Sequence, residues 1–184
     1  MTGHAHLDEP SAWVRRFARL IPAGGQVLDL ACGGGRHARY LAGLGYAVEA
    51  VDRDEPALAR LAGIERIVPR RADLESAPWP YAGQRFAGIV VVNYLHRPLL
   101  PLLVAALDTP AALIYETFAL GNERFGKPSN PDFLLRPGEL LECVRGALRV
   151  VAFEDLFVSD PKPARVQRIC AVAGELPQVP ADWK

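Results

Sequence analysis

The sequence has few of the features that mark secreted, metal-binding or nucleic-acid-binding proteins. Only three of its 184 residues are cysteines, and no two of them lie at the spacing of a metal site. This argues against a disulfide framework and against a metal centre, and it favours a reducing compartment. Basic and acidic residues number 21 each, so the formal net charge is zero. No overall field therefore attracts nucleic acid or an anionic membrane.

Long apolar runs are missing as well. No stretch approaches the roughly 20 apolar residues that a membrane-spanning helix needs. The first ten residues, MTGHAHLDEP, have neither the basic nor the apolar region of a secretory signal. We interpret His4 and His6 in this stretch as solvated terminal residues rather than as a metal site. A single cytoplasmic domain over residues 1–184 is therefore expected.

Strand-like and helix-like segments alternate along the chain. The predicted strands cover residues 26–30, 47–51, 64–69, 86–92, 111–117, 148–158 and 166–172. The predicted helices cover residues 12–20, 36–44, 55–61, 97–107 and 137–144. The run over 86–92 is the most apolar and β-branched, so it is expected at the centre of the sheet.

The link between the last two predicted strands decides their direction. Residues 159–163 are too few to form a crossover helix, so these strands should pair antiparallel. The whole pattern predicts an α/β fold, a doubly wound Rossmann-like sheet of seven strands that is mostly parallel with an antiparallel C-terminal hairpin strand. In such sheets ligands bind beyond the carboxyl ends of the strands.

A glycine-rich turn follows the first predicted strand and opens a helix, so its backbone can approach a ligand closely. Gly33-x-Gly35-x-x-Ala38 also matches the dinucleotide fingerprint, with Asp52 near the distance of a ribose-binding acid. Asp29, just before the turn, would repel a pyrophosphate and favour the ammonium and sulfonium of S-adenosylmethionine. Two plainer interpretations stay open: the turn serves only packing, and Asp29 only accepts hydrogen bonds from turn amides.

Four segments then occur in a fixed order: VLDLACGGGRH, VEAVDRD, RADLESAPW and FAGIVVVNYLH. Together they resemble class I S-adenosylmethionine-dependent methyltransferases, the small single-domain kind that includes tellurite-resistance-type and ubiquinone-biosynthesis-type enzymes. The resemblance extends over about residues 13–174. It departs from the family at Phe86-Ala87-Gly88, where an Asp is frequent before the fourth strand. The segment NYLH also lacks the Asn-Pro-Pro-Tyr signature of enzymes that methylate amino groups in nucleic acids, which argues against a DNA substrate.

The resemblance implies a set of cofactor-binding residues in the glycine turn. Asp29 and the backbone of Ala31, Cys32, Gly33 and Gly35 would hold the methionine end.

Further cofactor contacts are implied at the ends of the next strands. Asp52 would accept hydrogen bonds from both ribose hydroxyls, with Arg53 beside the adenine. Asp73 and the backbone of Leu74 would recognise the adenine, and Asn93 would face the methionine amino group. The seventh strand of the family inserts antiparallel between two neighbours, and the C-terminal hairpin of this chain is expected to do the same.

Three side chains near strand ends are candidates for a general base: Tyr94, His96 and Glu116. Each has an alternative role. His96 would cap or pack the next helix, Tyr94 would line the methyl-donor pocket, and Glu116 would pair with Arg124 or Arg136.

Residues 118–137 show neither helical nor strand periodicity, and we interpret them as a loop over the methyl-donor end rather than a structural crossover. The function expected is in-line methyl transfer from S-adenosylmethionine to a small molecule, with S-adenosylhomocysteine as product. The protein would be a monomer or homodimer without nucleic-acid or membrane partners. A non-catalytic S-adenosylmethionine-binding protein and an NAD(P)-dependent oxidoreductase remain as alternatives. Acceptor choice would fall to this loop and to the helix that contains Trp13.

Overall fold

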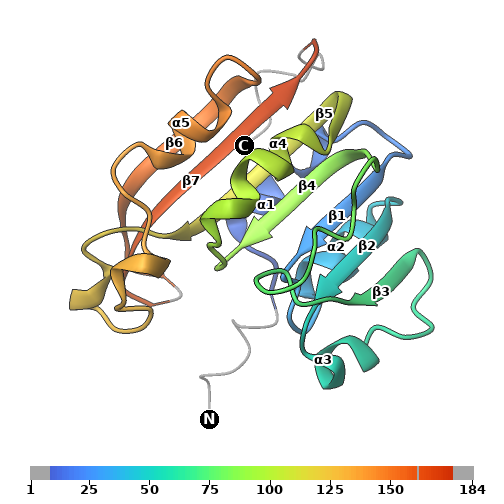
Figure 1. Ribbon diagram of the computed structural model, residues 1–184, viewed down its shortest axis with the longest axis horizontal. Coiled ribbons are helices and arrows are strands. Elements are labelled where there is room, and N and C mark those ends of the chain that lie inside the picture. The colour runs from blue at the N-terminus through green and yellow to red at the C-terminus, as the bar shows by residue number, and fades with distance from the viewer. Residues whose placement is uncertain (1–8, 161, 176–184) are drawn as a thin grey trace.

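Seven strands form one sheet in the computed structural model, which describes residues 9–160 and 162–175 (Figure 1). Their order across the sheet is β3-β2-β1-β4-β5-β7-β6. The bounds are β1 Gln26–Leu30, β2 Ala47–Asp52, β3 Ile67–Arg71, β4 Phe86–Val92, β5 Leu107–Phe118, β6 Arg149–Val158 and β7 Ala164–Ala173. The strand predicted at the centre, β4, is the middle one of the seven.

Strand direction divides the sheet into two parts. β1 to β5 are parallel, whereas β7 runs antiparallel to both of its neighbours, β5 and β6. This confirms the predicted fold class, including the insertion of the last strand between two others. The register places Glu116 of β5 opposite Arg168 of β7. It also pairs Leu107 with Phe86, so β5 begins where the sequence predicted the end of a helix.

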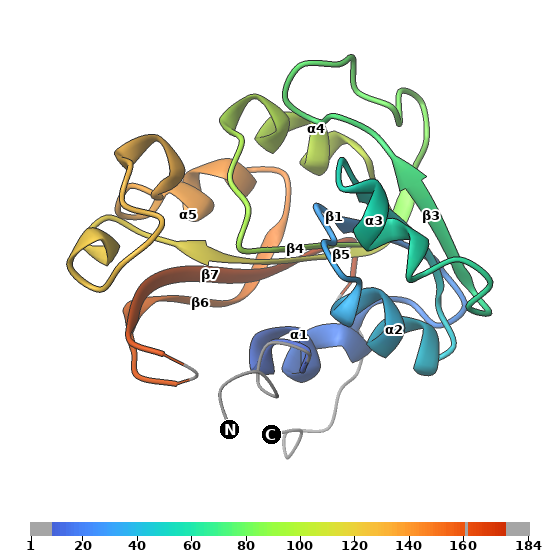
Figure 2. The same ribbon diagram turned by 90° about the horizontal axis from the view of Figure 1, so that it is seen from below.

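Helices cover both faces of the sheet (Figure 2). α1 (Ala12–Phe17) and α2 (Arg36–Gly43) lie on one face, and α4 (Leu100–Ala105) and α5 (Glu139–Val144) lie on the other. α3 (Glu55–Ala59) follows β2. Within the described ranges, no helix is long and apolar enough to cross a membrane.

α1 is fixed by one cap and one deeply buried aromatic stripe. The Ser11 hydroxyl accepts a hydrogen bond from the Trp13 amide, 3.1 Å away, and so begins the helix. Trp13 and Phe17 are each 1% exposed, and the Trp13 Nε1 donates to the Ile169 carbonyl of β7 at 3.1 Å. Burying each large aromatic side chain contributes about 2–3 kcal/mol, so α1 is firmly held against the sheet.

The segment over residues 118–137 contains two short 3₁₀ turns, Asn122–Arg124 and Pro131–Phe133. A parallel bridge between Ala119 and Leu135 closes it. The amide of Leu135 donates to the Phe118 carbonyl at 2.9 Å. The segment is therefore a closed loop whose two ends lie side by side, and it has more structure than its sequence pattern predicted.

Candidate functional site

Three cavities open at the edge of the sheet where β1 to β5 end and β7 begins. The first, the glycine-turn cavity, has a volume of about 940 Å³ and is lined by residues that include Ala31, Cys32, Gly33, Arg36, His37 and Asn93. The second, the acidic cavity, measures about 260 Å³ and is lined by residues that include Asp52, Arg53, Asp73, Leu74, Glu75 and Tyr94. The third, the β7 cavity, measures about 240 Å³ and is lined by residues that include Ser11, Arg36, Glu116, Phe118, Val166 and Arg168.

Asn93 lies where the three cavities meet, because it lines all of them. It directly follows β4 and has a φ of 59°, in the left-handed region, which asparagine tolerates better than most residues. Its amide donates to the Glu116 carbonyl at 2.9 Å. Ala31, with a φ of 52°, lines both the glycine-turn cavity and the acidic cavity. Such backbone strain is common where a chain contacts a ligand.

The glycine turn is fastened to the end of β2 through Asp52. The Gly33 amide donates to Asp52 Oδ2 at 2.7 Å, and the Asp54 amide donates to Asp52 Oδ1 at 2.9 Å. A carboxylate offers about four acceptor positions, so each oxygen can still accept one hydroxyl. Asp52 therefore keeps the capacity predicted for a ribose diol.

The two glycines singled out from the sequence have different surroundings. A Cβ on Gly33 would meet no atom within 4 Å, because this residue faces the glycine-turn cavity. A Cβ on Gly35 would lie 2.4 Å from a methyl group of Leu61. Gly35 is thus required for packing and does not line the cavities described above.

Asp29 lies beneath the turn rather than on the cavity wall. It is 1% exposed, and burial raises the pKa of its carboxyl to about 7, although a hydrogen bond from the Ala38 amide and the charge of Arg36 lower it. The carboxylate accepts a backbone amide at the start of α2, whereas its buried Oδ2 has no hydrogen-bond partner among the described residues. Its contact with the cofactor ammonium stays a prediction.

The acidic cavity contains a carboxylate that is already engaged. Asp73 accepts hydrogen bonds from the Ser76 hydroxyl at 2.6 Å and from the amides of Glu75 and Ser76 at 3.0 and 3.2 Å. These bonds, the hydroxyl first, lower the pKa of Asp73. Asp73 thus shapes the wall beside Leu74, and its contact with an adenine stays a prediction.

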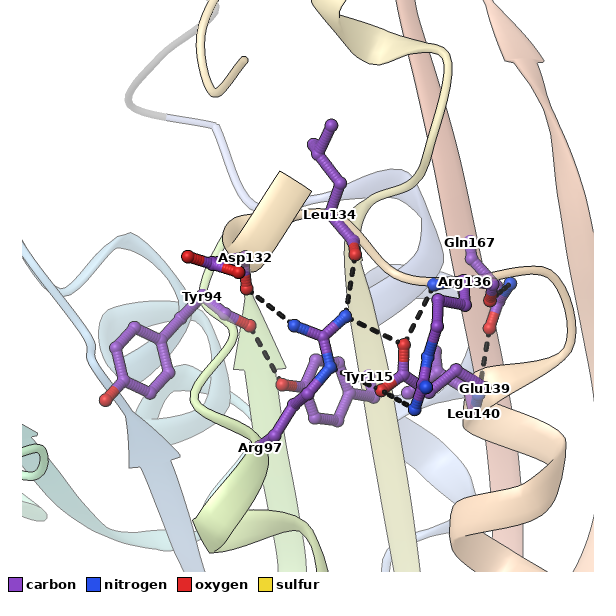
Figure 3. A network of polar contacts seen from close by, with 9 residues as sticks. All are labelled: Tyr94, Arg97, Tyr115, Asp132, Leu134, Arg136, Glu139, Leu140 and Gln167. Carbon is purple, nitrogen blue, oxygen red and sulfur yellow. Dashed lines mark hydrogen bonds and ion pairs between the residues drawn. The ribbon is translucent and has the colours of Figure 1, made fainter. Parts of the chain in front are cut away.

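Tyr94 contributes its ring to the acidic cavity and its backbone to the core. Its carbonyl accepts a hydrogen bond from Tyr115 Oη at 2.8 Å, and its ring is turned away from Arg97 (Figure 3). Burial, followed by the charges of Glu75 and Asp73, raises the pKa of Tyr94, so this phenol stays protonated. Among the described residues, its buried hydroxyl oxygen has no hydrogen-bond partner.

One arginine after β4 ties the segment of residues 118–137 to the rest of the site (Figure 3). Arg97 donates from Nε to Glu139 Oε1 at 2.6 Å, and from Nη1 and Nη2 to the carbonyls of Asp132 and Leu134 at 2.6 and 2.8 Å. From this segment Phe118 lines the β7 cavity. That residues 118–137 cover the methyl-donor end stays a prediction.

Glu116 has a different partner from those expected. Its Oε1 accepts a hydrogen bond from the Ser11 hydroxyl at 2.9 Å, and its Oε2 lies 3.2 Å from Arg168 Nη1. The pairing with Arg124 or Arg136 was wrong because β7, inserted beside β5, brings Arg168 directly opposite Glu116. Both carboxylate oxygens are therefore held at the wall of the β7 cavity.

The three candidate bases lie in different places. Glu116 lines the β7 cavity and Tyr94 lines the acidic cavity. His96 is half-buried at the start of the 3₁₀ turn Arg97–Leu99, where its side chain makes no capping hydrogen bond, and it lines none of the three cavities described here.

Sequence reasoning missed several residues of the site. His37 Nε2 accepts the Ser11 amide at 3.2 Å, and burial lowers the pKa of this histidine to about 3, so it is neutral. Arg36 could have been noticed from its place after the glycine turn. Ser11 and Arg168 could not, because only the long-range pairing of β5 with β7 and the docking of α1 bring them to Glu116. Among the described residues, no group of His, Cys, Asp and Glu could hold a metal ion.

Comparison with known proteins agrees with this geometry. The family model described as tellurite resistance protein TehB matches residues 13–110, more than half of the chain. The chain belongs to the TehB family. This membership confirms the predicted relationship to class I S-adenosylmethionine-dependent methyltransferases. No protein with a curated description matches the sequence significantly.

Solved structures share the TehB-family fold. TehB from Haemophilus influenzae superposes with a TM-score of 0.72 at 18% identity, and the alignment covers 88% of this chain and 61% of that one. An S-adenosylmethionine-dependent methyltransferase from Mesorhizobium loti gives a TM-score of 0.67 at 19% identity, covering 88% and 98% of the two chains. The chain thus spans about three fifths of the Haemophilus protein and nearly all of the Mesorhizobium one.

A third similar structure contains ligands. It is the 1,6-didemethyltoxoflavin-N1-methyltransferase of Burkholderia thailandensis with bound 1,6-didemethyltoxoflavin and S-adenosylhomocysteine. Its TM-score is 0.59 at 21% identity, and the alignment covers 94% of this chain and 75% of that chain. At these identities the likeness establishes the fold alone.

Proposed function

We propose that this TehB-family chain binds S-adenosylmethionine across the glycine-turn cavity and the acidic cavity, and transfers its methyl group to a small molecule in the β7 cavity. One observation carries the proposal: the three cavities meet at Asn93, at the carboxyl edge of the sheet. A ligand that spans the first two cavities therefore passes the mouth of the third. This is the arrangement that in-line transfer between a donor and an acceptor requires.

The residues present fit the cofactor. Asp52 keeps two acceptor positions for a ribose diol, and the open face of Gly33 leaves room for a chain that approaches the backbone. The acidic cavity, with Asp52, Asp73 and Glu75 on its wall, would repel a phosphate but suits an uncharged adenosine.

The sheet topology argues against the oxidoreductase alternative. A dinucleotide-binding sheet continues with parallel strands in the order 3-2-1-4-5-6. Here the strand beside β5 is β7, which is antiparallel and brings Arg168 to the site. The site beyond β5 is therefore built differently from that of a nicotinamide enzyme.

When bound, S-adenosylmethionine supplies an electrophilic methyl group whose bond to sulfur breaks as an acceptor lone pair forms the new bond. The chain has to align the two partners and exclude water. Asn93 lies where the cavities for the two partners meet. Glu116 lies at the wall of the β7 cavity, where it would accept a proton that the acceptor releases. Ser11 and Arg168 hold this carboxylate in place.

A small acceptor is supported by the size of the β7 cavity, about 240 Å³, which is below the range typical of drug-sized ligands. The neutral net charge also gives no attraction to nucleic acid. The Burkholderia methyltransferase of the same fold has a small heterocycle bound, in line with this acceptor class.

Calorimetric titration of the protein with S-adenosylhomocysteine tests the cofactor assignment. Saturable binding with a Kd well below about 1 mM is expected, with none for NADH at the same concentrations. Binding of NADH without binding of S-adenosylhomocysteine would refute the proposal. Methyl transfer to a mixture of small metabolites, followed with a labelled methyl group, separates an enzyme from a non-catalytic binding protein.

Asp52→Ala sharpens this test. It removes a charged acceptor of two ribose hydroxyls, so the affinity for S-adenosylhomocysteine should fall about 10-fold to 100-fold. Asp54→Asn is the matched control, because Asp54 lies two residues away, caps α3 and does not line the acidic cavity. Asparagine caps a helix as well as aspartate does, so this variant should bind like the wild type. Equal losses in the two variants would contradict the ribose contact.

A further inference from the structure

The β7 cavity combines apolar side chains with one shielded carboxylate. Phe118 and Glu116 reach its wall from the end of β5, and Val158 and Val166 reach it from β6 and β7. An acceptor that enters this cavity therefore meets both an apolar surface and the Glu116 carboxylate. The charge and the hydrogen bonds of that carboxylate determine which acceptors suit it.

The charges on the whole wall nearly balance, but water screens them unequally. The wall has four basic and three acidic side chains: Arg15, Arg36, Lys162, Arg168, Glu9, Glu116 and Asp160. Glu9 has a side chain 66% exposed, and Asp160 is exposed after the end of β6. The side chain of Glu116 is 14% exposed. Glu116 is thus the acid of this wall whose charge water screens least.

The basic partner of Glu116 neutralises it in part. Arg168 donates from Nε to Glu154 Oε2 at 2.7 Å and from Nη1 to Glu116 Oε2 at 3.2 Å. One guanidinium therefore serves two carboxylates, and the shorter contact is with Glu154, which does not line the cavity. Arg16 lies 4.0 Å from Glu154 with a side chain 49% exposed, where an ion pair contributes little. Negative charge thus remains in excess around Glu116.

Arg168 is engaged on several sides, whereas Glu116 can accept further hydrogen bonds. The Arg168 guanidinium lies over the buried ring of Trp13, 4.7 Å from the ring centroid, in addition to its two carboxylate contacts. On Glu116, the Ser11 hydroxyl and Arg168 each occupy one of about four acceptor positions. A hydrogen-bond donor that enters the cavity would therefore find an acceptor, and an anion would find a carboxylate that repels it.

We propose that the β7 cavity selects a small amine as the methyl acceptor, with its nitrogen at Glu116 and its apolar body against Phe118 and Val166. The inference rests on the proposed function, because it names the acceptor of that methyl transfer. Amines carry a positive charge at neutral pH. The Glu116 carboxylate would therefore attract the amine as it enters and stabilise the N-methylated ammonium that forms.

The transfer balances with the groups already named. The ammonium passes one proton to Glu116, from which the proton reaches water, and the nitrogen gains a free lone pair. This lone pair forms the bond to the methyl carbon, while the electron pair of the carbon–sulfur bond stays on the sulfur. The products are S-adenosylhomocysteine and an N-methylated ammonium ion.

The test compares three ligands that share a phenyl ring and differ in one group: benzylamine, benzyl alcohol and benzoate. Each is titrated, with saturation-transfer NMR as readout, into the full chain saturated with S-adenosylhomocysteine, so that the probes do not occupy the cofactor site. The wild type should bind benzylamine about tenfold more tightly than benzoate, with benzyl alcohol in between, as expected for a charge-assisted contact. In Glu116→Gln this ratio should fall below about twofold.

Asp160→Asn is the matched control, because it removes an equal charge from an exposed part of the same wall and should keep the wild-type ratio. The inference is overturned if the wild type binds benzoate as tightly as benzylamine or binds neither. It is also overturned if Glu116→Gln keeps the ratio or if Asp160→Asn loses it equally. A wild type that does not bind S-adenosylhomocysteine overturns the proposed function instead. If Glu116→Gln does not fold, as judged by its thermal transition, Glu116→Asp withdraws the carboxylate by one methylene and should give a ratio below that of the wild type.

Discussion

The two sides of the site are held together in different ways. On the cofactor side, main-chain amides of the turn are the donors: Cys32 donates to the Val51 carbonyl and Gly33 donates to the Asp52 carboxylate, both at the end of the neighbouring strand. On the other side, polar side chains add to the main-chain hydrogen bonds that close the segment of residues 118–137. Arg97 supports its second half, and Asn122 accepts from the Arg165 amide at 3.1 Å.

This difference predicts where each side is vulnerable. The donors in the glycine turn are main-chain amides, which do not depend on the side chain that their residue carries. Apart from its acceptor Asp52, the turn therefore depends mainly on backbone conformation and space. The segment of residues 118–137 depends on a few polar side chains whose loss leaves buried groups without partners. Conformational substitutions should therefore affect the first side, and changes of charge the second.

Arg97→Met should have the largest effect on stability. Glu139 is 8% exposed, and the variant leaves its carboxylate without its main partner, at a cost of about 3 kcal/mol in the free energy of unfolding. Urea denaturation measures this value. Arg145→Met is the control, because its partner Glu142 is 64% exposed and such a pair contributes less than about 1 kcal/mol. A similar loss of unfolding free energy in both variants would contradict the view that buried polar side chains hold the segment of residues 118–137.

The pH dependence of the same ion pair gives a second, somewhat smaller effect. Burial raises the pKa of Glu139, but hydrogen bonds from Arg97 and Arg136 outweigh it and bring the pKa down to about 2. The unfolded chain then binds the proton more readily, so the stabilisation is complete above about pH 5 and is lost as the pH falls toward 2.

The stability advantage of the wild type over Glu139→Gln should accordingly shrink by about 2 kcal/mol between pH 7 and about pH 2.5. Denaturation curves at a series of pH values test this, with Glu142→Gln as the exposed counterpart. An advantage that stays constant over this range would show that the carboxylate is not held by charge.

The smallest expected effects concern the glycine turn, where two glycines can be compared directly. Gly35→Ala forces a Cβ into Leu61 at a φ of 74°, and should cost about 2 kcal/mol of stability. Gly33→Ala meets open space at a φ of 52°, so only about 1 kcal/mol of backbone strain is expected. Titration with S-adenosylhomocysteine should show the reverse order, with the larger loss of affinity for Gly33→Ala. If Gly35→Ala caused the larger loss in both stability and affinity, Gly35 would not be a packing residue and Gly33 a binding residue as we infer.

Features that depend on a local sequence pattern could be predicted from the sequence. The bounds of β1 and β4 were predicted to the residue, because a short apolar run next to a glycine turn or a proline-rich loop is a local pattern. Asp52, Asp73, Leu74, Asn93 and part of the glycine turn line the cavities, and the cofactor contacts that the resemblance implies for them stay predictions.

Contacts across long stretches of sequence could not be predicted. The partner of Glu116 depends on the register of β5 with β7, 52 positions apart, and no local pattern specifies that register. The depth of Asp29, which is 1% exposed, could not be predicted either, because a sequence does not show how deep a residue at a strand end lies. The structure of residues 118–137 depends on Arg97, which precedes the segment by more than 20 positions and carries no mark of that role.

The position of β7 has a consequence for the order in which the molecule can assemble. β6 is made before β7, yet among the strands that the structure describes it pairs with β7 alone. On a ribosome, the five parallel strands can associate as they emerge, whereas β6 has to wait beside an incomplete edge until the final strand enters between it and β5. Arg168 and Val166 arrive with that strand, so the β7 cavity is completed last, after the glycine-turn cavity can already exist. A nascent chain interrupted before residue 164 would therefore lack Ala164, Val166 and Arg168, which complete the wall of the β7 cavity.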